Sequence, residues 1–432
     1  MRFDTAAAAS RALPSSPTSS VFVFVFVAIV VGTMMLSSSS PSFAAVVVVA
    51  SAAYSGSSPI VKNVAVPGLR RGMDYCKLGT SDLLVSKVCM GTMTYGKQNT
   101  LEEGVRQLDV AFDEYGVNFI DTAEIYPTPP SGDTLGLTDK TISSFLKRAG
   151  GRRREDVILA TKVAGPGVTW LPRKDPDTPS RLTRGQILRS VDESLKRLGT
   201  DYVDLLQLHW PDRYAGGLFG QPDFTPSLVR ESAVPFDETL GALQSLVESG
   251  KVRHVGVSNE TPYGVCTMIG MAESHPEKYP RIVSIQNSYS LVVRKDYESG
   301  LAEACHHHRV GLLPYSPLAG GSLTNKYADR DNLPPNSRYS SFPGYMARYY
   351  GSQNEAAVRA YAEVAAGRGM KPGAMALSWC YHREHVCSTI IGATSLDQLR
   401  ENIRAYDTRL DDEILKEIDG VYKRYTDPTK YA

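Results

Sequence analysis

Eight short apolar runs recur along the chain from residue 88 onward. They cover residues 88–91, 119–121, 157–162, 203–209, 252–257, 282–286, 311–315 and 388–391. Apolar and polar positions do not alternate within these runs, which is typical of strands that are buried on both faces. The pattern therefore predicts eight strands of one parallel sheet.

Helical patterns lie between these runs. Residues 183–199 repeat apolar side chains at helical spacing and end at Gly199, a residue type that commonly terminates helices. Residues 235–250 repeat the pattern, with Asp237 as a candidate N-cap and Gly250 as the stop. Parallel strands require crossover segments of this kind, so each helix is expected to return the chain to the same end of the sheet.

The alternation of strand and helix places residues 74–432 in the α/β class. Eight such units favour a closed (β/α)8 TIM barrel over an open doubly wound sheet. The glycine-rich fingerprint of the open dinucleotide fold is missing, because the nearest match carries Trp170 in place of its last glycine. Two long segments, 211–235 and 325–351, are rich in Pro, Gly, Tyr and Asp. We expect them to be long loops at the C-terminal face, where barrels hold active sites.

The first 73 residues differ in composition from the rest. Residues 21–36 form an apolar run that is shorter than the roughly 20 residues of a membrane span. Arg11 precedes the run and small residues follow it, as in signal peptides. The stretch up to Gly72 is rich in Ser and Ala and free of acids, as transit peptides are. Residues 1–73 are therefore expected to be a targeting leader that is disordered or removed.

The order of the two leader segments bears on localisation. A signal peptide followed by a transit-like segment resembles the two-part leader of plastid proteins in algae with complex plastids. Secretion, or retention in the endoplasmic reticulum, is the alternative. The six cysteines show no dense disulfide framework, and disulfide-stapled secreted domains are usually much smaller. We therefore expect the reducing interior of a plastid (chloroplast).

The charge balance excludes some classes of partner. The chain holds 47 Lys and Arg residues and 46 Asp and Glu residues. Five of the basic residues and one of the acidic residues lie in residues 1–73. The remaining chain is thus close to neutral and offers no basic field for nucleic acid or for anionic lipid. We expect a small-molecule ligand, no nucleic acid, and no membrane in the mature form. A monomer and a homo-oligomer both remain open.

Polar residues close three successive apolar runs. Asp121 ends the second run, Lys162 the third and His209 the fourth, and Tyr126 follows Asp121 by five positions. In a barrel the carboxyl ends of all strands open onto one face, so these side chains are expected to converge there. One polar residue at the end of a strand is commonplace. An acid, a cation and an imidazole in succession point to an active site.

Proton donation from a phenol is the chemistry that this set supports. A tyrosine has a pKa of about 10 and is a poor acid at neutral pH. An ammonium about 4 Å away favours the phenolate by roughly 4 kcal/mol at an effective dielectric near 20. That effect would offset about three pKa units before desolvation is counted. Asp121 would hold Lys162 in place, and His209 would hydrogen-bond the oxygen that Tyr126 protonates.

With these four residues and several ordered motifs, residues 74–422 resemble the aldo-keto reductases. Asp121, Tyr126, Lys162 and His209 match the catalytic tetrad of that family. The motifs "GVSN", "IQNSYS", "YSPLAGGSLTNKY" and "IIGATSLDQLRENI" match its cofactor site. The resemblance implies cofactor contacts for Thr92, Met93, Asp121, Ser258, Asn259, Gln286, Tyr315, Ser316, Pro317, Leu318, Gly320, Lys326, Arg338, Gly392, Thr394, Gln398, Glu401 and Asn402.

Within that family, "LHWPDR" and the following "LFG" resemble the Tas-like reductases and the potassium-channel β-subunits. Aldose reductases usually carry basic residues where this chain has Gly392 and Gln398. Lys326 and Arg338 are the cations left to contact a 2′-phosphate, so the resemblance favours NADPH and NADP+ over the unphosphorylated cofactor.

The resemblance implies hydride transfer from the nicotinamide to an aldehyde or ketone, with Tyr126 as the proton donor. Trp210 either lines the substrate pocket or packs under the following loop. An NADP(H)-binding regulatory subunit that reports redox state with little turnover is the alternative function. Channel β-subunits can lack the histidine, so the presence of His209 favours turnover.

Three other clusters carry less weight. Residues 380–387 contain two cysteines and two histidines, but their spacing fits no standard zinc pattern. The histidines of residues 305–309 are expected at a helix end, where imidazoles complement the helix dipole. The basic run at 151–156 is expected to be a solvated turn. No metal site is predicted.

Overall fold

The computed structural model describes residues 60–61, 73–148, 154–171, 179–217, 219, 224–230 and 232–430. All of them belong to one unit, Ser55–Ala432. The predicted signal and transit segments lie outside the described residues, apart from the backbone of 60–61 and Met73. Within the part that is described, no helix is both long and apolar enough to cross a lipid bilayer.

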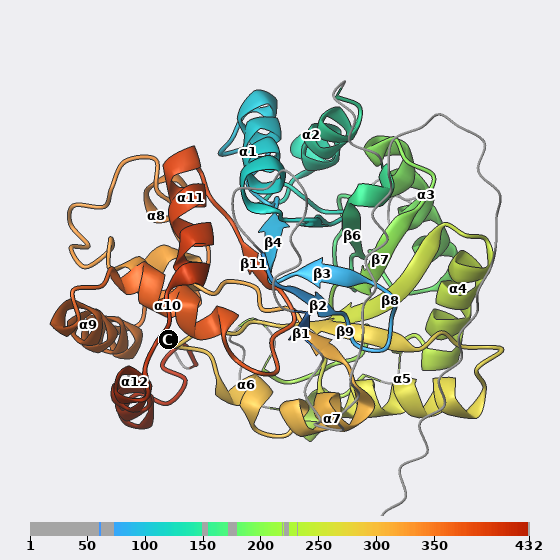
Figure 1. The fold of residues 1–432 in the computed structure, drawn as a ribbon. Helices are drawn as coiled ribbons and strands as arrows, with labels where there is room; N and C mark the ends of the chain where they lie inside the picture. The colour runs from blue at the N-terminus through green and yellow to red at the C-terminus, as the bar shows by residue number, and fades with distance from the viewer. Residues whose placement is uncertain are drawn as a thin grey trace, which may run out of the picture. The chain divides into compact units, whose positions relative to one another are not determined.

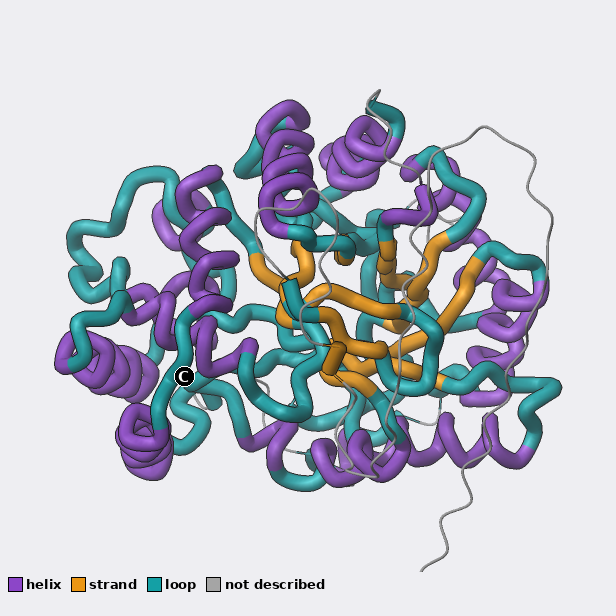
Figure 2. Tube along the Cα trace, in the orientation of Figure 1, coloured by secondary structure: helices purple, strands orange, loops and turns teal. Residues whose placement is uncertain are grey.

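Eight parallel strands form the centre of the fold (Figures 1 and 2). They are β4 (Val88–Gly91), β5 (Phe119–Asp121), β6 (Ile158–Val163), β7 (Val203–Leu208), β8 (Val252–Ser258), β9 (Ile282–Gln286), β10 (Gly311–Leu312) and β11 (Thr389–Ile391). Their order in the sheet is β10-β9-β8-β7-β6-β5-β4-β11. The sheet therefore follows the chain, with the last strand placed beside the first.

Backbone hydrogen bonds also connect the two outer strands of this series. The Cys387 N–H donates to the Leu312 carbonyl and the Ile390 N–H donates to the Pro314 carbonyl, each at 2.9 Å. The α/β class is confirmed, and this arrangement is consistent with the predicted (β/α)8 barrel. The predicted run at 311–315 contributes only Gly311–Leu312 as regular strand, because Pro314 has no N–H to donate to a ladder.

The helices lie outside the strands, as the purple tubes around the orange ones show in Figure 2. They are α1 (Leu101–Tyr115), α2 (Leu137–Leu146), α3 (Arg184–Leu198), α4 (Phe236–Glu248), α5 (Pro262–Ser274), α6 (Lys295–Glu298), α7 (Leu301–His308), α8 (Arg338–Ser341), α9 (Ser352–Gly367), α10 (Pro372–Tyr381), α11 (Leu396–Arg404) and α12 (Asp412–Arg424). They contribute apolar side chains to the main hydrophobic core, and α3, α4 and α5 contact β6, β8 and β9 respectively.

Local sequence sets the helix ends. α3 ends at Gly199, as predicted, with φ at 67°, where glycine is favoured over other residues. For α4 the predicted cap was wrong: Pro235 occupies the N-cap position and Asp237 lies in the first turn. There the Asp237 carboxylate complements the positive end of the helix dipole. α4 also ends at Glu248, before the predicted stop at Gly250.

An antiparallel hairpin covers the amino-terminal ends of the parallel strands. It consists of β2 (Tyr75–Lys77) and β3 (Leu84–Ser86), and β1 (Ile60–Val61) pairs with β2. Buried apolar side chains, among them Leu78, Leu83, Phe119, Leu205 and Val283, pack together there. This end of the sheet is therefore filled with apolar side chains. The predicted polar residues at the strand ends lie at the opposite, carboxyl end.

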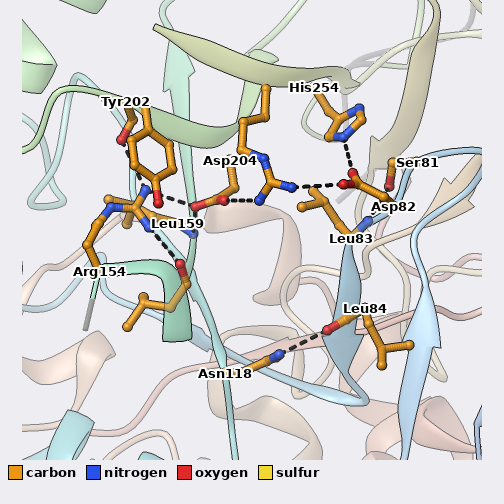
Figure 3. Close-up of polar contacts among 12 residues, drawn as sticks. Ser81, Asp82, Leu83, Leu84, Asn118, Arg154, Leu159, Tyr202, Asp204 and His254 are labelled. Carbon is orange, nitrogen blue, oxygen red and sulfur yellow. Dashed lines mark hydrogen bonds and ion pairs between the residues drawn. The ribbon is translucent and has the colours of Figure 1, made fainter. Parts of the chain in front are cut away.

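A chain of ion pairs connects the hairpin turn to the strands (Figure 3). Asp82 in the turn accepts from Arg253 at 2.9 Å and contacts His254 at 2.6 Å. Arg253 and Arg154 both donate to Asp204, each at 2.8 Å. Arg154 had been predicted in a solvated turn. It is instead partly buried, because the Asp204 carboxylate and nearby carbonyl oxygens accept its N–H groups.

Candidate active site

The predicted tetrad meets at the carboxyl ends of three neighbouring strands. Asp121 is the last residue of β5, Lys162 lies near the end of β6, and His209 follows β7. Lys162 Nζ lies 2.6 Å from Asp121 Oδ2 and 3.4 Å from Tyr126 Oη. The Tyr126 and His209 rings lie edge to face, with centroids 6.1 Å apart. The structure thus brings all four side chains together.

The buried charges of this set have hydrogen-bonding partners. Lys162 has a fully buried side chain, and its Nζ also donates to the Thr122 carbonyl at 2.9 Å. Asp121 Oδ1 accepts from Gln286 Nε2 at 2.8 Å and from Gln207 Nε2 at 3.3 Å. A buried ion pair is tolerated when its remaining donors and acceptors are satisfied in this way.

The electrostatics of Tyr126 differ from the expectation. Burial raises the pKa of the Tyr126 phenol well above its usual value, and the Asp121 carboxylate raises that pKa further. The expected lowering by the Lys162 ammonium does not prevail, because the desolvation of the buried phenol is the larger effect. Tyr126 therefore keeps its proton at neutral pH, which is the form that a proton donor needs.

His209 is neutral at neutral pH. Burial lowers the pKa of its imidazole well below the usual range, and the Lys162 ammonium lowers that pKa further. Its Nδ1 atom is buried and has no hydrogen-bond partner among the described residues. Asn259 Nδ2 donates to the His209 carbonyl at 2.9 Å and so ties this residue to β8. A neutral imidazole can donate one hydrogen bond to a ligand oxygen.

A cavity of about 990 Å³ opens beside the tetrad. Tyr126, His209 and Trp210 line it, and Lys162 lies behind the wall that Tyr126 forms. All of the residues for which cofactor contacts were predicted also line this cavity: Thr92, Met93, Asp121, Ser258, Asn259, Gln286, Tyr315, Ser316, Pro317, Leu318, Gly320, Lys326, Arg338, Gly392, Thr394, Gln398, Glu401 and Asn402. Their individual roles stay predictions.

Hydrogen bonds fix the residues near the tetrad end of the cavity. Ser258 Oγ donates to the Gln286 carbonyl at 2.7 Å, and Asn259 Nδ2 donates to Ser258 Oγ at 3.1 Å. Tyr315 Oη donates to Asn259 Oδ1 at 2.7 Å. Thr92 Oγ1 donates to the Asp121 carbonyl at 2.8 Å. The polar wall is therefore held in place before any ligand binds.

A second part of the cavity has the chemistry of a phosphate site. Gly320 and Gly321 have φ of 68° and 103°, which favours glycine and brings backbone close to the cavity. Lys326 and Arg338 line the same region, and neither has a carboxylate partner among the described residues. Unpaired cations beside a glycine turn suit the phosphates of a dinucleotide. The residues present therefore fit a nicotinamide dinucleotide.

The far end of the cavity is lined by β11 and α11. Gln398 Oε1 accepts from the Thr394 N–H at 3.1 Å and from Thr394 Oγ1 at 3.0 Å. Asn402 Nδ2 donates to the Gly392 carbonyl at 3.1 Å. Lys371 forms an ion pair of 3.2 Å with Glu401. These bonds orient side chains for which cofactor contacts were predicted.

Sequence reasoning missed several residues of the site. Gln207, Arg348 and Lys371 were not singled out, although Gln207 binds Asp121 and the other two line the cavity. A signal existed for Gln207, since it lies two positions before His209 in an otherwise apolar stretch and so faces the same side of the strand. Arg348 and Lys371 lie outside the matched motifs and gave no such signal.

Trp210 lines the cavity and also packs under the following loop, and its role toward a substrate stays a prediction. Its ring lines the cavity next to His209, with centroids 4.9 Å apart. Its Nε1 donates to the Pro166 carbonyl at 3.1 Å, and its outer edge meets Phe219. Apolar neighbours such as Ile125 pack in the same cluster. The tetrad therefore opens onto an aromatic, largely apolar surface.

The cysteines and histidines of residues 380–387 pack into the protein. The His385 ring contacts Tyr289 and Tyr297, with centroids 5.3 and 5.0 Å away. His382 Nε2 lies 3.1 Å from the Tyr406 carbonyl. Among the described residues, no three His, Cys, Asp or Glu side chains lie close enough to hold a metal ion.

Comparisons with known proteins agree with this geometry. The model of the aldo/keto reductase family matches residues 87–423. Protein tas of Escherichia coli strain K12 is 41% identical over 356 residues, covering 82% of this chain and 99% of that protein. L-glyceraldehyde 3-phosphate reductase of Escherichia coli O157:H7 is 30% identical over 338 residues, covering 77% and 87%.

A more distant relative belongs to another functional class. A protein described as a probable voltage-gated potassium channel subunit beta, from Arabidopsis thaliana, is 28% identical over 340 residues. The match covers 78% of this chain and 92% of that protein. Both the family model and the similarity to Tas agree with the motifs that line the cavity. This chain belongs to the aldo/keto reductase family of oxidoreductases, in its Tas-like branch.

Proposed function

We propose that this protein is an NADPH-dependent reductase that converts aldehydes or ketones to alcohols. The observation that carries the proposal is the position of Lys162 Nζ, 2.6 Å from Asp121 and 3.4 Å from the hydroxyl of Tyr126, a residue that lines a large cavity. Membership of an oxidoreductase family supports it. The proposal takes the eight strands as a closed (β/α)8 barrel, with this cavity at its carboxyl face.

The side chains divide the work as follows. Tyr126 holds a proton at its hydroxyl and donates it to the substrate oxygen, and the Lys162 ammonium stabilises the phenolate that remains. Neutral His209 donates a hydrogen bond to the same oxygen and orients the carbonyl. A bound nicotinamide would supply the hydride that adds to the carbonyl carbon. Positioned proton transfer of this kind contributes about 10² to 10⁴ in rate.

The preference for the phosphorylated cofactor rests on charge. Lys326 and Arg338 line the cavity without an acid partner among the described residues. Arg348 adds a third cation to the lining. An additional phosphate would compensate this charge and gain charge-assisted hydrogen bonds. NADPH is therefore proposed over NADH.

A test of the function compares two variants in a spectrophotometric assay. Loss of absorbance at 340 nm with NADPH and a panel of reactive aldehydes should be seen for the wild type. The change Tyr126→Phe should abolish it, whereas Tyr263→Phe, the same change at an exposed site outside the cavity, should not. Activity that survives in Tyr126→Phe would remove Tyr126 from the role of proton donor.

A regulatory subunit that binds NADP(H) with little turnover is the second candidate. The similarity to a protein described as a channel subunit favours it. Both candidates predict tight binding of NADPH, so they separate on turnover. A wild-type protein that binds NADPH but reduces none of the aldehydes would support the second candidate.

We also propose that residues 1–73 direct the protein to a plastid. The proposal rests on the signal-like run followed by an acid-free stretch rich in Ser and Ala. A fluorescent protein fused to residues 1–73 should accumulate in the plastid. Fluorescence confined to the medium would instead indicate secretion.

A further inference from the structure

Gln207 connects two side chains of the proposed site. Its Nε2 donates to Asp121 Oδ1 at 3.3 Å, and its Oε1 accepts from Gln286 Nε2 at 3.1 Å. Gln286 Nε2 also donates to Asp121 Oδ1, at 2.8 Å. An ionised carboxylate only accepts hydrogen bonds, so both amides must turn their NH₂ groups toward Asp121. The three side chains therefore fix one another's orientation.

The surrounding strands leave room for this triangle. Gln207 of β7 is paired in register with Lys162 of β6 on one side and with Gly256 of β8 on the other. A β-carbon at Gly256 would come within 2.3 Å of Ser284 Oγ and 3.4 Å of Gln207 Cγ. A side chain at Gly256 would therefore collide with Ser284, whereas its contact with Gln207 would be an ordinary van der Waals one.

The burial of Gln207 has a cost that an apolar residue would not have. Its side chain is fully buried in a strand whose neighbouring positions are mostly leucine. A buried amide destabilises the fold unless its donors and acceptor are hydrogen-bonded. At this position the amide reaches both the carboxylate and a side chain of the cavity wall, so the cost is offset only by those two contacts.

We infer that Gln207 is a positioning residue of the active site. It holds the Asp121 carboxylate toward Lys162 and fixes the Gln286 side chain at the cavity wall. Gln207 acts through these two residues and does not line the cavity itself. A neutral amide suits the task, because a second cation would compete with Lys162 for Asp121 and a carboxylate would repel it. The inference rests on the proposed function.

Two substitutions test this role. Gln207→Met keeps the length of the side chain and removes both polar atoms. Because it removes one charge-assisted hydrogen bond, kcat should fall about 10- to 100-fold. The released Gln286 should weaken NADPH binding severalfold. Ser284→Ala is the control in the same layer of the sheet, since its buried hydroxyl has no partner among the described residues, and it should leave kcat unchanged.

The second substitution, Gln207→Glu, gives a pH dependence of activity that a purely structural role would not produce. In Gln207→Glu, a protonated carboxyl can donate to Asp121 and accept from Gln286, whereas an ionised one repels Asp121. The activity of Gln207→Glu relative to wild type should therefore rise as the pH is lowered. Gln207→Met should stay low at every pH.

The other titratable groups around the triangle do not mask this readout. Burial raises the pKa of Tyr126 and that of Cys89 well above their usual values, and burial lowers the pKa of His209 well below its own. Lys162 and Asp121 are paired with each other at 2.6 Å. A pH dependence that is absent from the wild type and present in Gln207→Glu therefore reports the introduced carboxyl.

The outcomes separate this inference from the proposed function. Equal kcat and equal NADPH affinity in Gln207→Met and wild type would overturn it, as would equal losses in both variants without pH dependence. If the wild type binds NADPH but reduces no carbonyl compound, the proposed function fails. The NADPH affinity of Gln207→Met then decides whether Gln207 positions Gln286. Circular dichroism checks folding, and Gln207→Glu carries the test if Gln207→Met does not fold.

Discussion

The indole ring of Trp210 lies directly against the backbone of Gly165. A β-carbon at Gly165 would come within 2.3 Å of Trp210 Cδ1 and 2.5 Å of the Trp210 carbonyl oxygen. Because backbone as well as side chain blocks that space, no small adjustment would relieve the contact. Glycine at this position therefore sets where the aromatic wall of the cavity stands.

The change Gly165→Ala should displace Trp210. We expect a loss of about 1–3 kcal/mol in the free energy of unfolding, the usual cost of overpacking. The KM for carbonyl substrates should rise, while the affinity for NADPH should change less, because Ser258 and Asn259 are also held by bonds to Gln286 and Tyr315 that do not involve Trp210. Steady-state kinetics measure the KM values, and denaturant unfolding measures the free energy of unfolding. Gly185→Ala, where nothing lies within 4 Å of the new carbon, is the control.

Loss of the buried ammonium should affect both stability and rate. Lys162→Met leaves the Asp121 carboxylate buried without its cation, so the free energy of unfolding should fall by about 3–5 kcal/mol. The kcat should fall at least about 10²-fold, because the phenolate of Tyr126 is no longer stabilised. Adding Asp121→Asn in the same chain should restore much of the stability and none of the activity. Restored activity in the double variant would contradict the assigned role of Lys162.

Acid should destabilise the protein through a partly buried histidine. Burial, helped by Arg383, lowers the pKa of His385 to about 4, whereas in the unfolded chain a histidine has a pKa of about 6.5. Below that value the unfolded chain binds a proton that the folded one does not. Stability is therefore present above pH 6.5 and is lost as the pH falls toward 4, at no more than about 1.4 kcal/mol per pH unit.

The change His385→Gln should remove this contribution. Between the pH values of about 4 and about 6.5, the free energy of unfolding of the variant should depend less steeply on pH than that of the wild type. Above neutral pH the two curves should run parallel. Identical slopes over the acid range would show that His385 binds its proton equally well in both states.

The ion pairs at the hairpin should differ in energetic weight. Asp204 is buried and accepts from Arg154 and Arg253, so Asp204→Asn should cost several kcal/mol of unfolding free energy, in line with about 3–5 for breaking a buried pair. Asp82 has a largely exposed side chain, and Asp82→Asn should cost about 1 kcal/mol or less. Denaturant unfolding of both variants checks the order. A larger effect at Asp82 would contradict it.

Cofactor preference should depend on the unpaired cations. Lys326→Met and Arg338→Met should weaken the binding of NADPH more than that of NADH, because each removes a charge that can contact phosphate. Fluorescence titration with both cofactors measures the ratio. Lys423→Met, in α12 and away from the cavity, is the control. An equal loss of affinity for NADPH and NADH would show that neither cation contacts the additional phosphate of NADPH.

Strand ends were predictable from the sequence because the topology is regular. Asp121, Lys162 and His209 close buried runs, and the carboxyl ends of neighbouring parallel strands must meet. The positions of these residues therefore followed from the pattern alone. Gln207 was missed because a polar residue inside a strand has many possible partners, and only coordinates reveal that Asp121 and Gln286 are both in reach.

Energetic detail was less accessible than position. The sequence indicated an ammonium near the phenol, but the pKa of Tyr126 depends chiefly on how deeply the phenol is buried and then on the Asp121 carboxylate. Likewise, the cap of α4 depended on whether Pro235 or Asp237 begins the helix, a shift that sequence patterns do not resolve.

The complete enclosure of Lys162 has a consequence for chemical labelling. Its side chain has no exposed surface, and its amine is held by three oxygen atoms. Acylating or pyridoxylating reagents that modify accessible lysines would thus leave this amine intact while the protein stays folded. Isotope-coded labelling followed by peptide mapping would then report the opening of this region, since Lys162 would acquire its label only from molecules in which the surrounding strands have separated.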